Sequence, residues 1–549
     1  LSHLGDPADL RAALLASRVV GRGGASETFP LVLDDAGRLY LQRYYDYECR
    51  LARRLLRTRP PATHPSDDDP AALRPALDAH FGADGGGDEP DWQKLAAALA
   101  LRGRLTVISG GPGTGKTTTV VALLACLLEG DPGCRIALAA PTGKAAARMT
   151  EAIAQRAARL PEAIRRAMPR DAATVHRLLE AGPRGFGRHA GNLLAIDVLV
   201  VDEASMLDLA LATRLLEAVP DAARIVLLGD KDQLAAVETG SVFGELSADT
   251  TLSAACRARL GALTGIAPAR IVPPAPAQPS VLHDCAIWLR RSYRFGTDSA
   301  IARLAAAIRE GAGDRAVAGA GLMFDNASAA LDFALQGHAA FLDSVREGAS
   351  AQAVHAAFAR FRVLAALREG PRGAVALNAE IERRFRAALG PLDHTPRSPW
   401  YPGRPVLVRR NDAVARLFNG DIGIALPDDA GAIEVVFAGS DGGLRRIAPV
   451  RLPEHETAFA MTVHKAQGSE FDGVLVVLPE RENRVLSREL LYTAVTRARS
   501  DVRLWATEAV LVGAIGATTP RHSGLLARLA EASIQRDPAP VPQAAGKLP

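Results

Sequence analysis

The stretch GGPGTGKT at residues 110–117 restricts the fold of this chain more than any other feature. It matches G-x-x-x-x-G-K-[ST] and lies between an apolar run at 105–109, predicted to be a strand, and a predicted helix. Such a loop turns backbone N–H groups towards phosphates, while Lys116 reaches the β- and γ-phosphates and Thr117 binds Mg²⁺. A glycine-rich turn with an incidental lysine is the alternative, and it leaves this context unexplained. The predicted nucleotide contacts are Gly110, Gly111, Pro112, Gly113, Thr114, Gly115, Lys116, Thr117 and Thr118.

Two polar segments follow predicted strands downstream of this loop. In IDVLVVDEAS, Asp202 is placed to hold Mg²⁺ through its water shell, and Glu203 to polarise the water that attacks the γ-phosphate. In GDKDQL, Gln233 can hydrogen-bond both the γ-phosphate and that water, so it senses the nucleotide state. A solvated acidic pair and an ordinary turn are the plainer interpretations. The position of both segments after the phosphate loop favours a site that hydrolyses ATP with Mg²⁺.

The second half of the chain supplies arginines far from the loop in sequence. Arg294 lies in LRRSYRF and Arg497 in YTAVTRAR. An arginine contributed across a domain interface stabilises charge on the transferring phosphoryl group, so that ATP binding draws two domains together and hydrolysis releases them. A surface charge is the ordinary alternative in a chain this rich in arginine. The motif contexts favour catalytic roles for both arginines and indicate a translocating motor.

Three segments offer the small residues, hydroxyls and basic groups that approach a nucleic-acid backbone closely. They are PTGK at 141–144, TVHR at 174–177 and AFAMTVHKAQGSE at 458–470. With one platform in each half, the protein can hold a single strand and step along it. A histidine satisfied within the core is the alternative for His176. The predicted contacts with nucleic acid are Pro141, Thr142, Lys144, Thr174, His176, Thr462, His464 and Lys465.

Alternating strands and helices from residue 91 predict an α/β fold of two domains, each a parallel sheet covered by helices on both faces. The expected strands are 105–109, 135–140, 197–201 and 224–228, then 363–367, 374–377, 473–477 and 502–505. Short runs between Gly and Asp turns predict a small β-barrel inserted at about 402–455. The proline-rich stretch 264–280 is expected to be an exposed insertion. The predicted divisions are a small helical N-terminal domain with a linker (1–90), a first motor domain (91–280), a second (281–535) and a disordered tail (536–549).

Composition excludes several classes of protein. Of the 549 residues, 48% are apolar and 23% charged, which fits a globular chain of several domains. Five cysteines without a C-x-x-C pair argue against a disulfide framework or zinc site and indicate a cytoplasmic protein. We expect no membrane contact and no secretory signal, because neither a bilayer-spanning apolar run nor a signal-like N-terminus is visible. Lysine is rare, yet four of the six lysines lie within the segments above: Lys116, Lys144, Lys231 and Lys465.

These segments, in this order, resemble the motifs of superfamily 1 helicases with two RecA-like motor domains: GGPGTGKTTTV, APTGKAAARM, TVHRLL, VVDEASM, GDKDQL, SYRF, TVHKAQGSEF and YTAVTRAR. Within that superfamily the chain resembles the RecD family over most of residues 39–507. DWQKLAAALAL is similar to the adenine-recognition segment of RecD, which places Gln93 against the base. The resemblance also assigns Gly468 and Glu470 to the nucleotide site. GRPVLVRRNDAVARLFNGDIGIAL is similar to the segment leading into the SH3-like insertion of RecD, which gives the predicted barrel its type.

The resemblance implies a 5′→3′ DNA helicase, driven by ATP with Mg²⁺, that acts on single-stranded DNA. It further implies assembly with RecB and RecC into exodeoxyribonuclease V, which unwinds and degrades double-stranded DNA ends in double-strand-break repair and recombination. The N-terminal domain would dock on RecC, and the nuclease centre is expected on RecB.

Other functions remain open at this stage. Stand-alone RecD-like helicases carry extra repeats before the phosphate loop, and only residues 1–109 precede it here, which favours the complex-bound type. A stand-alone helicase on DNA or RNA, a P-loop ATPase unrelated to nucleic acid, and a scaffold that only clamps DNA are the alternatives. A clamp has no need of the full catalytic set of Lys116, Asp202, Glu203, Gln233, Arg294 and Arg497.

Overall fold

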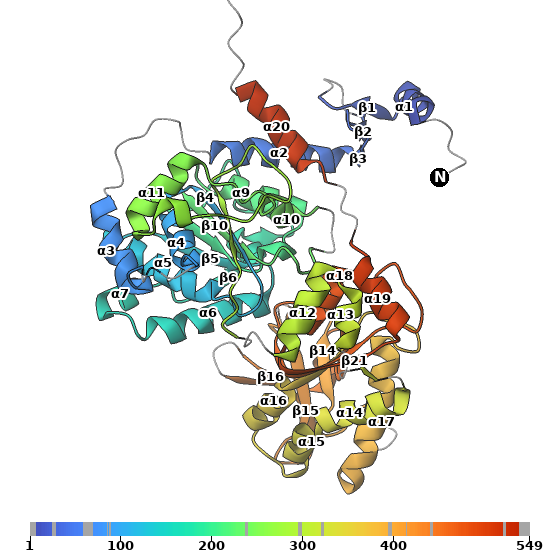
Figure 1. The fold of residues 1–549 in the computed structure, drawn as a ribbon. Coiled ribbons are helices and arrows are strands. Elements are labelled where there is room, and N and C mark those ends of the chain that lie inside the picture. Colours follow the sequence, from blue (N-terminus) through green and yellow to red (C-terminus); the bar gives the residue numbers. More distant parts are fainter. Residues whose placement is uncertain are drawn as a thin grey trace, which may run out of the picture.

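Two α/β domains lie side by side, with a small N-terminal unit above them (Figure 1). This computed structural model describes residues 7–24, 29–58, 70–84, 86, 89–236, 240–294, 299–319, 323–324, 326–393, 398–412, 414–439, 443–519 and 523–536. The tail predicted from residue 536 lies almost wholly outside these ranges. Within them, no helix has both the length and the apolar character needed to cross a membrane.

The N-terminal unit combines helices with a small sheet. Its elements are α1 (Pro7–Ala16), β1 (Val20–Arg22), β2 (Leu31–Leu33), β3 (Leu39–Leu41) and α2 (Gln42–Arg57). The predicted small helical domain therefore has its helices but also a sheet that was not predicted, because strands of three residues are too short to show an alternating pattern. Arg54 of α2 donates hydrogen bonds to the carbonyls of Leu216 (2.8 Å) and Val219 (2.9 Å), which anchors the unit to the first domain.

The first domain is built on six parallel strands in the order β11-β4-β10-β9-β5-β6. The strands are β4 (Leu105–Gly110), β5 (Ile136–Ala140), β6 (Ala172–Thr174), β9 (Val198–Val201), β10 (Arg224–Gly229) and β11 (Ala286–Leu289), with a separate hairpin of β7 (Ala181–Gly182) and β8 (Gly185–Phe186). The α-helices are α3 (Pro70–Phe81), α4 (Trp92–Arg102), α5 (Lys116–Gly130), α6 (Gly143–Ala157), α7 (Glu162–Ala167), α8 (Val175–Leu178), α9 (Leu209–Ala218), α10 (Val242–Leu246) and α11 (Ala254–Thr264). The four strands predicted for this domain are confirmed.

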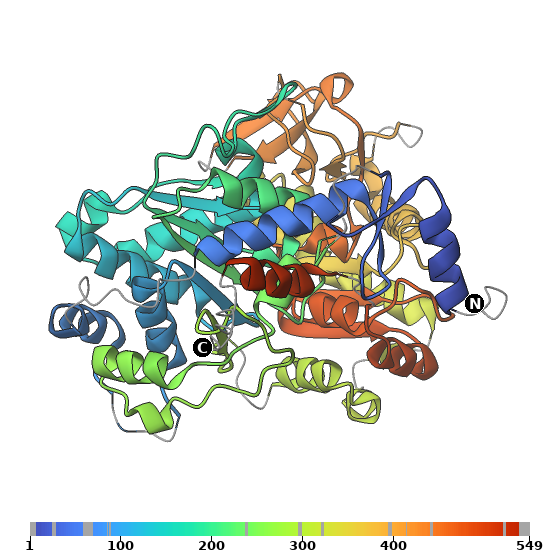
Figure 2. The same ribbon diagram turned by 90° about the horizontal axis from the view of Figure 1, so that it is seen from above.

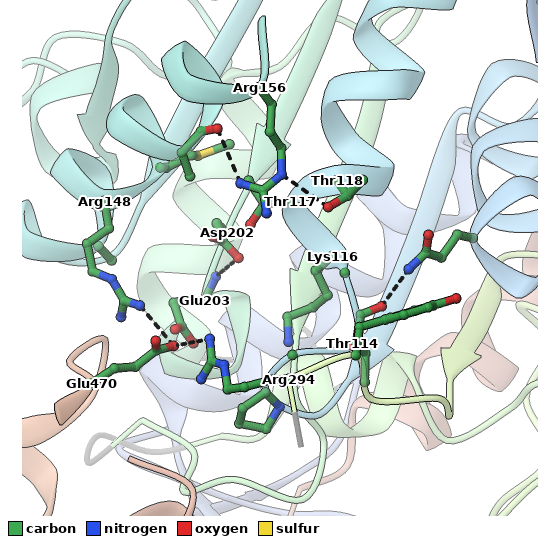
Figure 3. Close-up of a pocket in the computed structure, with 18 of the residues that line it drawn as sticks. Thr114, Lys116, Thr117, Thr118, Arg148, Arg156, Asp202, Glu203, Arg294 and Glu470 are labelled. Atoms are coloured by element: carbon green, nitrogen blue, oxygen red, sulfur yellow. Dashed lines mark hydrogen bonds and ion pairs between the residues drawn. The ribbon is translucent and has the colours of Figure 1, made fainter. Parts of the chain in front are cut away.

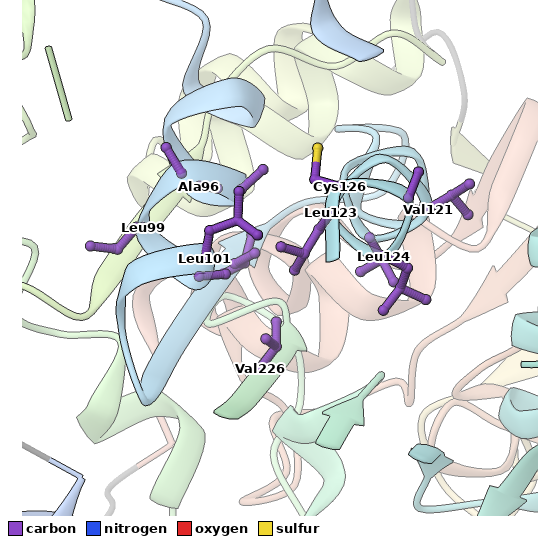
Figure 4. Close-up of a cluster of buried hydrophobic side chains, with 14 of the residues drawn as sticks. Ala96, Leu99, Leu101, Val121, Leu123, Leu124, Cys126 and Val226 are labelled. Carbon is purple, nitrogen blue, oxygen red and sulfur yellow. The ribbon is translucent and has the colours of Figure 1, made fainter. Parts of the chain in front are cut away.

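Successive side chains of β4 point to opposite faces of this sheet and pack in two different hydrophobic cores. Ile108 packs in the cluster made by α4 and α5 (Figure 4), and Val107 packs in the cluster on the opposite face with residues of α9. A strand buried on both faces is typical of a parallel sheet between helical layers.

Two predicted boundaries of the domains are wrong. Strand β11 pairs with β4, so the first domain extends beyond residue 280 to Leu289. The proline-rich stretch 271–280 forms no regular structure and connects α11 to β11, with Val272 64% exposed. Helix α20 (Leu525–Arg536) does not pack within the second domain but lies beside α2 (Figure 2).

The second domain is built on five parallel strands in the order β12-β21-β20-β13-β19. The strands are β12 (Met323–Phe324), β13 (Phe361–Ala365), β19 (Ala460–Thr462), β20 (Phe471–Val477) and β21 (Ala498–Trp505). The α-helices are α12 (Ala300–Glu310), α13 (Gly313–Ala318), α14 (Ala327–Gly337), α15 (Ala339–Arg346), α16 (Ala351–Ala359), α17 (Ala374–Leu389), α18 (Arg488–Val495) and α19 (Glu508–Gly516). The strand predicted at 374–377 is wrong, since these residues begin α17, whose buried side chains recur with helical spacing at Ala374, Leu377 and Ile381.

An antiparallel sheet is inserted into the second domain where the barrel was predicted. Its strands are β14 (Pro405–Val408), β15 (Ile422–Pro427), β16 (Ile433–Ala438), β17 (Leu444–Ile447) and β18 (His455–Thr457), in the order β17-β16-β15-β14-β18. Strand β18 leads directly into β19, so the insertion is joined to the parallel sheet beside it. The comparison with an SH3-like barrel stays a prediction.

Candidate functional site: an interdomain nucleotide cleft and a second cleft beside it

The predicted phosphate-binding loop connects β4 to α5. Gly113 and Gly115 have φ angles of 76° and 81°, which favour glycine. A Cβ atom at Gly115 would lie 2.1 Å from Gln93 Nε2, and one at Gly113 would lie 2.2 Å from Arg294 Cβ. These two glycines therefore let side chains from α4 and from the segment after β11 close on the loop.

Gln93 reaches the loop because of the way α4 begins. Asp91 caps this helix, and its carboxylate accepts hydrogen bonds from the backbone N–H groups of Gln93 (2.9 Å) and Lys94 (3.1 Å). Gln93 Nε2 then donates to the carbonyl of Thr114 at 2.8 Å. The structure thus places Gln93 against the loop, while its contact with a base stays a prediction.

Lys116 and the acidic pair lie close together in the same cleft (Figure 3). Lys116 Nζ donates to the loop carbonyls of Gly110 and Gly111, the latter at 3.1 Å. Asp202 follows β9 and accepts a hydrogen bond from the N–H of Glu203 at 2.9 Å. Burial, and then the neighbouring Glu203, raise the pKa of Asp202. Glu203 has a φ of 52°, a left-handed conformation that residues other than glycine rarely adopt outside functional turns.

Gln233 and Arg497, which lie 264 residues apart in sequence, are in direct contact. Arg497 Nη2 donates to Gln233 Oε1 at 2.6 Å, and Gln233 Nε2 donates to Asp230 Oδ2 at 2.9 Å. Both side chains are buried, and Arg497 Nε also donates to the carbonyl of Thr493 at 3.1 Å. The predicted sensor of the first domain and the predicted arginine of the second therefore form one hydrogen-bonded unit across the interface.

Oε1 of Glu470 pairs with Arg148 and Arg294 at the same interface (Figure 3), and Oε2 lies near a third arginine. Its Oε1 lies 2.8 Å from Nη2 of both Arg148, on α6, and Arg294, and its Oε2 lies 3.3 Å from Nε of Arg499. Burial raises the pKa of Glu470, but Arg148 and Arg294 more than offset this and hold the pKa at about 2. Glu470 is therefore ionised, and of the two arginines on its Oε1, Arg294 was predicted and Arg148 was not.

These side chains line a cleft of about 740 Å³ between the two domains. All the predicted catalytic, nucleotide and metal residues line it, except Gly110 and Gly111, whose carbonyls hold Lys116 beneath the loop. Tyr293 also lines the cleft, and this residue is 60% exposed. Thr117 and Asp202 offer the hard oxygen donors that Mg²⁺ prefers, so the residues present fit this ion.

The predicted DNA contacts of the first domain lie together at the ends of adjacent strands. Ala140 of β5 pairs in register with Thr174 of β6, so the segments that follow are neighbours. Thr142 and Thr174 each cap the helix that follows, accepting backbone hydrogen bonds at 3.2 and 3.1 Å. Lys144 and His176 are exposed, which rules out the core alternative for the histidine.

The predicted DNA contacts of the second domain line another cleft, of about 630 Å³. Thr462 ends β19, and His464 and Lys465 follow it. Arg368, just after β13, lies on the same cleft, and Val375 of α17 exposes 52% of its surface. The structure therefore gathers the predicted contacts into one group in each domain.

The two groups approach each other where the domains meet. A Cβ atom at Gly468, just after the second group, would lie 3.6 Å from Cβ of Ala145, just after the first. A bound strand that touches both groups would therefore cross the interface that the nucleotide cleft also spans.

Two family models match the chain. The AAA domain model matches residues 93–239, and the UvrD-like helicase C-terminal domain model matches residues 457–505. The RecBCD enzyme subunit RecD of Mycobacterium tuberculosis is 40% identical over 548 residues, covering 95% of this chain and 85% of that protein. The chain belongs to the RecD family.

Other relatives agree with this assignment. RecD of Haemophilus influenzae is 37% identical over 482 residues, covering 80% of this chain and 72% of that protein. The ATP-dependent RecD2 DNA helicase of Deinococcus radiodurans is 32% identical over 504 residues, but the match covers only 59% of it, against 90% of this chain. The resemblance to RecD drawn from the motifs is confirmed.

Several residues of this RecD-family site were not predicted from the sequence. Arg148 and Arg156 both line the nucleotide cleft from α6, and Arg156 Nε donates to Thr118 Oγ1 at 3.1 Å. A helical signal was available, because Arg148 lies four residues after Lys144 and therefore about one turn further along the same helix. Asp230 had no such signal, since its role depends on its contact with Gln233.

Proposed function

We propose that this chain is an ATP-dependent DNA helicase that serves as the RecD subunit of a RecBCD-type exodeoxyribonuclease V. The observation that carries the proposal is the contact between Gln233 and Arg497, which joins the two domains at the nucleotide cleft. A static ATPase domain needs no such joint, whereas a motor must convert the nucleotide state into a change between domains.

The cleft residues divide the work of hydrolysis between them. Lys116 leaves the loop carbonyls to bind the β- and γ-phosphates, and Glu203 orients the attacking water. Mg²⁺, held by Thr117 and Asp202, would neutralise charge on the phosphates. Arg294 and Arg497 supply positive charge from outside the phosphate loop, where charge develops on the transferring group.

Movement on DNA follows from the two groups of predicted contacts. The group around Lys144 belongs to the first domain and the group around Lys465 to the second. If closure of the nucleotide cleft shortens the distance between them, alternating grip moves a single strand by one step per ATP. Donors at helix starts and strand ends favour contact with the phosphodiester backbone, which carries no sequence information.

The proposed partners and the proposed direction of travel along DNA are argued from membership of the RecD family. M. tuberculosis and H. influenzae RecD are named as subunits of RecBCD enzymes, and the chain covers more of them than of D. radiodurans RecD2. We therefore propose RecB and RecC as partners, with the nuclease centre on RecB. We further propose 5′→3′ travel and a role at double-stranded DNA ends in double-strand-break repair and recombination.

The first test is ATP hydrolysis by the purified chain with and without single-stranded DNA, beside Lys116→Gln. We expect strong stimulation by DNA and little activity in the variant. Single-stranded RNA in the same assay separates a DNA motor from an RNA motor. Hydrolysis that DNA leaves unchanged, both alone and with RecB and RecC added, would refute the helicase proposal. Full unwinding without RecB and RecC would favour a stand-alone enzyme of the RecD2 kind.

A further inference from the structure

A single carboxylate holds the basic side chains of the second cleft. Glu456 Oε1 forms an ion pair with Lys465 Nζ at 2.5 Å, and Glu456 Oε2 lies 3.4 Å from Arg368 Nη2. A third cation, Arg409, has its Nε 3.7 Å from the same Oε2. The side chain of Glu456 is 27% exposed, so this network lies at the mouth of the cleft and within reach of a ligand.

Three separate segments bring these groups together. Arg368 follows β13 and Lys465 follows β19, which are adjacent parallel strands of the second domain. Glu456 belongs to β18 of the antiparallel insertion, where its pairing with Leu407 of β14 sets its position. The carboxylate is thus supplied by the insertion and the cations mainly by the parallel sheet.

The charges that line this cleft cancel. Apart from histidine, its charged lining residues are two cations, Arg368 and Lys465, and two carboxylates, Glu382 and Glu456. Phosphate contacts dominate the affinity of proteins for nucleic acid, so a cleft that binds a strand benefits from a net positive charge. The carboxylates make the grip of this cleft weaker than its cations alone would give.

We propose that Glu456 competes with a DNA phosphate for Lys465 and Arg368, and that this competition limits the affinity of the second domain for a single strand. The inference rests on the proposed function and deepens it. When a strand enters, a phosphodiester replaces the Glu456 carboxylate on Lys465, and when the strand leaves, the carboxylate takes that place again. Ion pairs at partly exposed positions are weak, so the exchange is readily reversible. A motor that must release DNA in every cycle gains speed from such an exchange.

The structure supplies a matched control for this proposal. Glu454 lies two residues from Glu456 and pairs with the same Arg409, with its Oε1 2.5 Å from Arg409 Nη1. Its side chain is 57% exposed and does not line the cleft. Replacing Glu454 removes the same charge from the same segment without freeing Lys465.

The test compares Glu456→Gln and Glu454→Gln in the full chain by the anisotropy of a fluorescein-labelled oligothymidylate. We expect Glu456→Gln to bind about three- to fivefold more tightly than the unchanged protein, the size that a partly exposed ion pair allows. Glu454→Gln should change the affinity by less than about 1.5-fold at the same salt concentration. Equal gains in both variants would overturn the proposal, because they would show a general effect of charge and not competition at Lys465.

A second comparison examines the role of Lys465 directly. In a Lys465→Ala background, Glu456→Gln should lose most of its effect on affinity, as expected for residues that act on each other. An unchanged or weaker affinity of Glu456→Gln would show that Glu456 only supports the fold, and a melting curve identifies that case. Failure of the unchanged protein to bind the oligonucleotide would instead count against the proposed function.

Discussion

The two domains build the same strand–loop–helix unit into different binding surfaces. In the first, β4 leads through residues 111–115 into α5, and in the second, β13 leads through residues 366–373 into α17. The first loop turns at Gly113 and Gly115 and lines the cleft where phosphates are predicted to bind. The second loop folds back on the start of α17, because the N–H groups of Ala374 and Val375, the first two residues of that helix, donate to the loop carbonyls of Leu367 and Arg368, both at 3.0 Å.

This difference decides how each domain can hold an anion. A loop and helix start whose N–H groups face a cleft bind phosphate with the backbone, whereas a helix start whose first N–H groups are bonded to its own loop leaves the task to side chains. The second domain accordingly presents Lys465 and Arg368 on its cleft, both paired with Glu456. In the nucleotide cleft, Arg148 and Arg294 form ion pairs with Glu470 in a similar way. In both clefts a carboxylate of the protein is paired with basic side chains that could otherwise bind a phosphate.

The largest effect is expected at the joint between the domains. Arg497→Gln should lower the kcat of DNA-stimulated ATP hydrolysis by about 10³-fold, because an arginine that reaches the transferring phosphoryl group from outside the phosphate loop stabilises the transition state to that extent. Arg499→Gln serves as the control, since this side chain is 52% exposed, and a change of less than about threefold is expected. Similar losses in both variants would contradict the role given to Arg497, provided that the melting temperatures match.

A smaller loss of ATP hydrolysis is expected from a substitution in the first loop, and almost none from a matched substitution in the second. Gly115→Ala places a methyl group against Gln93 Nε2, so kcat/KM for ATP should fall by about 10²-fold, as is typical when a site is displaced by about 1 Å. Gly370 also has a positive φ, of 97°, but a Cβ there meets nothing within 4 Å. Gly370→Ala should therefore destabilise the fold slightly and leave hydrolysis nearly unchanged. A loss of activity in Gly370→Ala comparable to that in Gly115→Ala would mean that the second loop also binds nucleotide.

The smallest effect concerns the carboxyl of Glu245, which belongs to α10 of the first domain and lies beside α20. Burial raises the pKa of Glu245 to about 7, and its neighbours include Glu48 and Ser523. A carboxyl with a raised folded-state pKa contributes its full stability below the unfolded value of about 4.5, and this contribution is lost as the pH rises through about 7. Glu245→Gln should therefore melt about 2 °C higher than the unchanged protein at pH 8 and no higher at pH 4.5. A shift of equal size at both pH values would show that ionisation is not the cause.

Much of the fold and the nucleotide site could be predicted because their signals are local. The phosphate loop can be recognised from eight consecutive residues. The strands β4, β9 and β10 are short apolar runs that can be recognised without knowing what packs against them. Short or ambiguous runs could not be resolved in this way. Residues 374–377 are apolar in either a strand or a helix, and only their packing as the first turn of α17 decides between the two.

Residue types and their spacing were enough to predict the chemistry of the nucleotide site, since glycines, a lysine, an acidic pair and a glutamine at set spacings leave few other uses. Which groups from distant segments meet became visible only in the folded chain. Arg497 lies on Gln233, Arg148 shares Glu470 with Arg294, and Glu456 of the insertion holds Lys465. Such contacts leave no local pattern in the sequence, because each joins side chains from separate structural elements that become neighbours only when the chain folds.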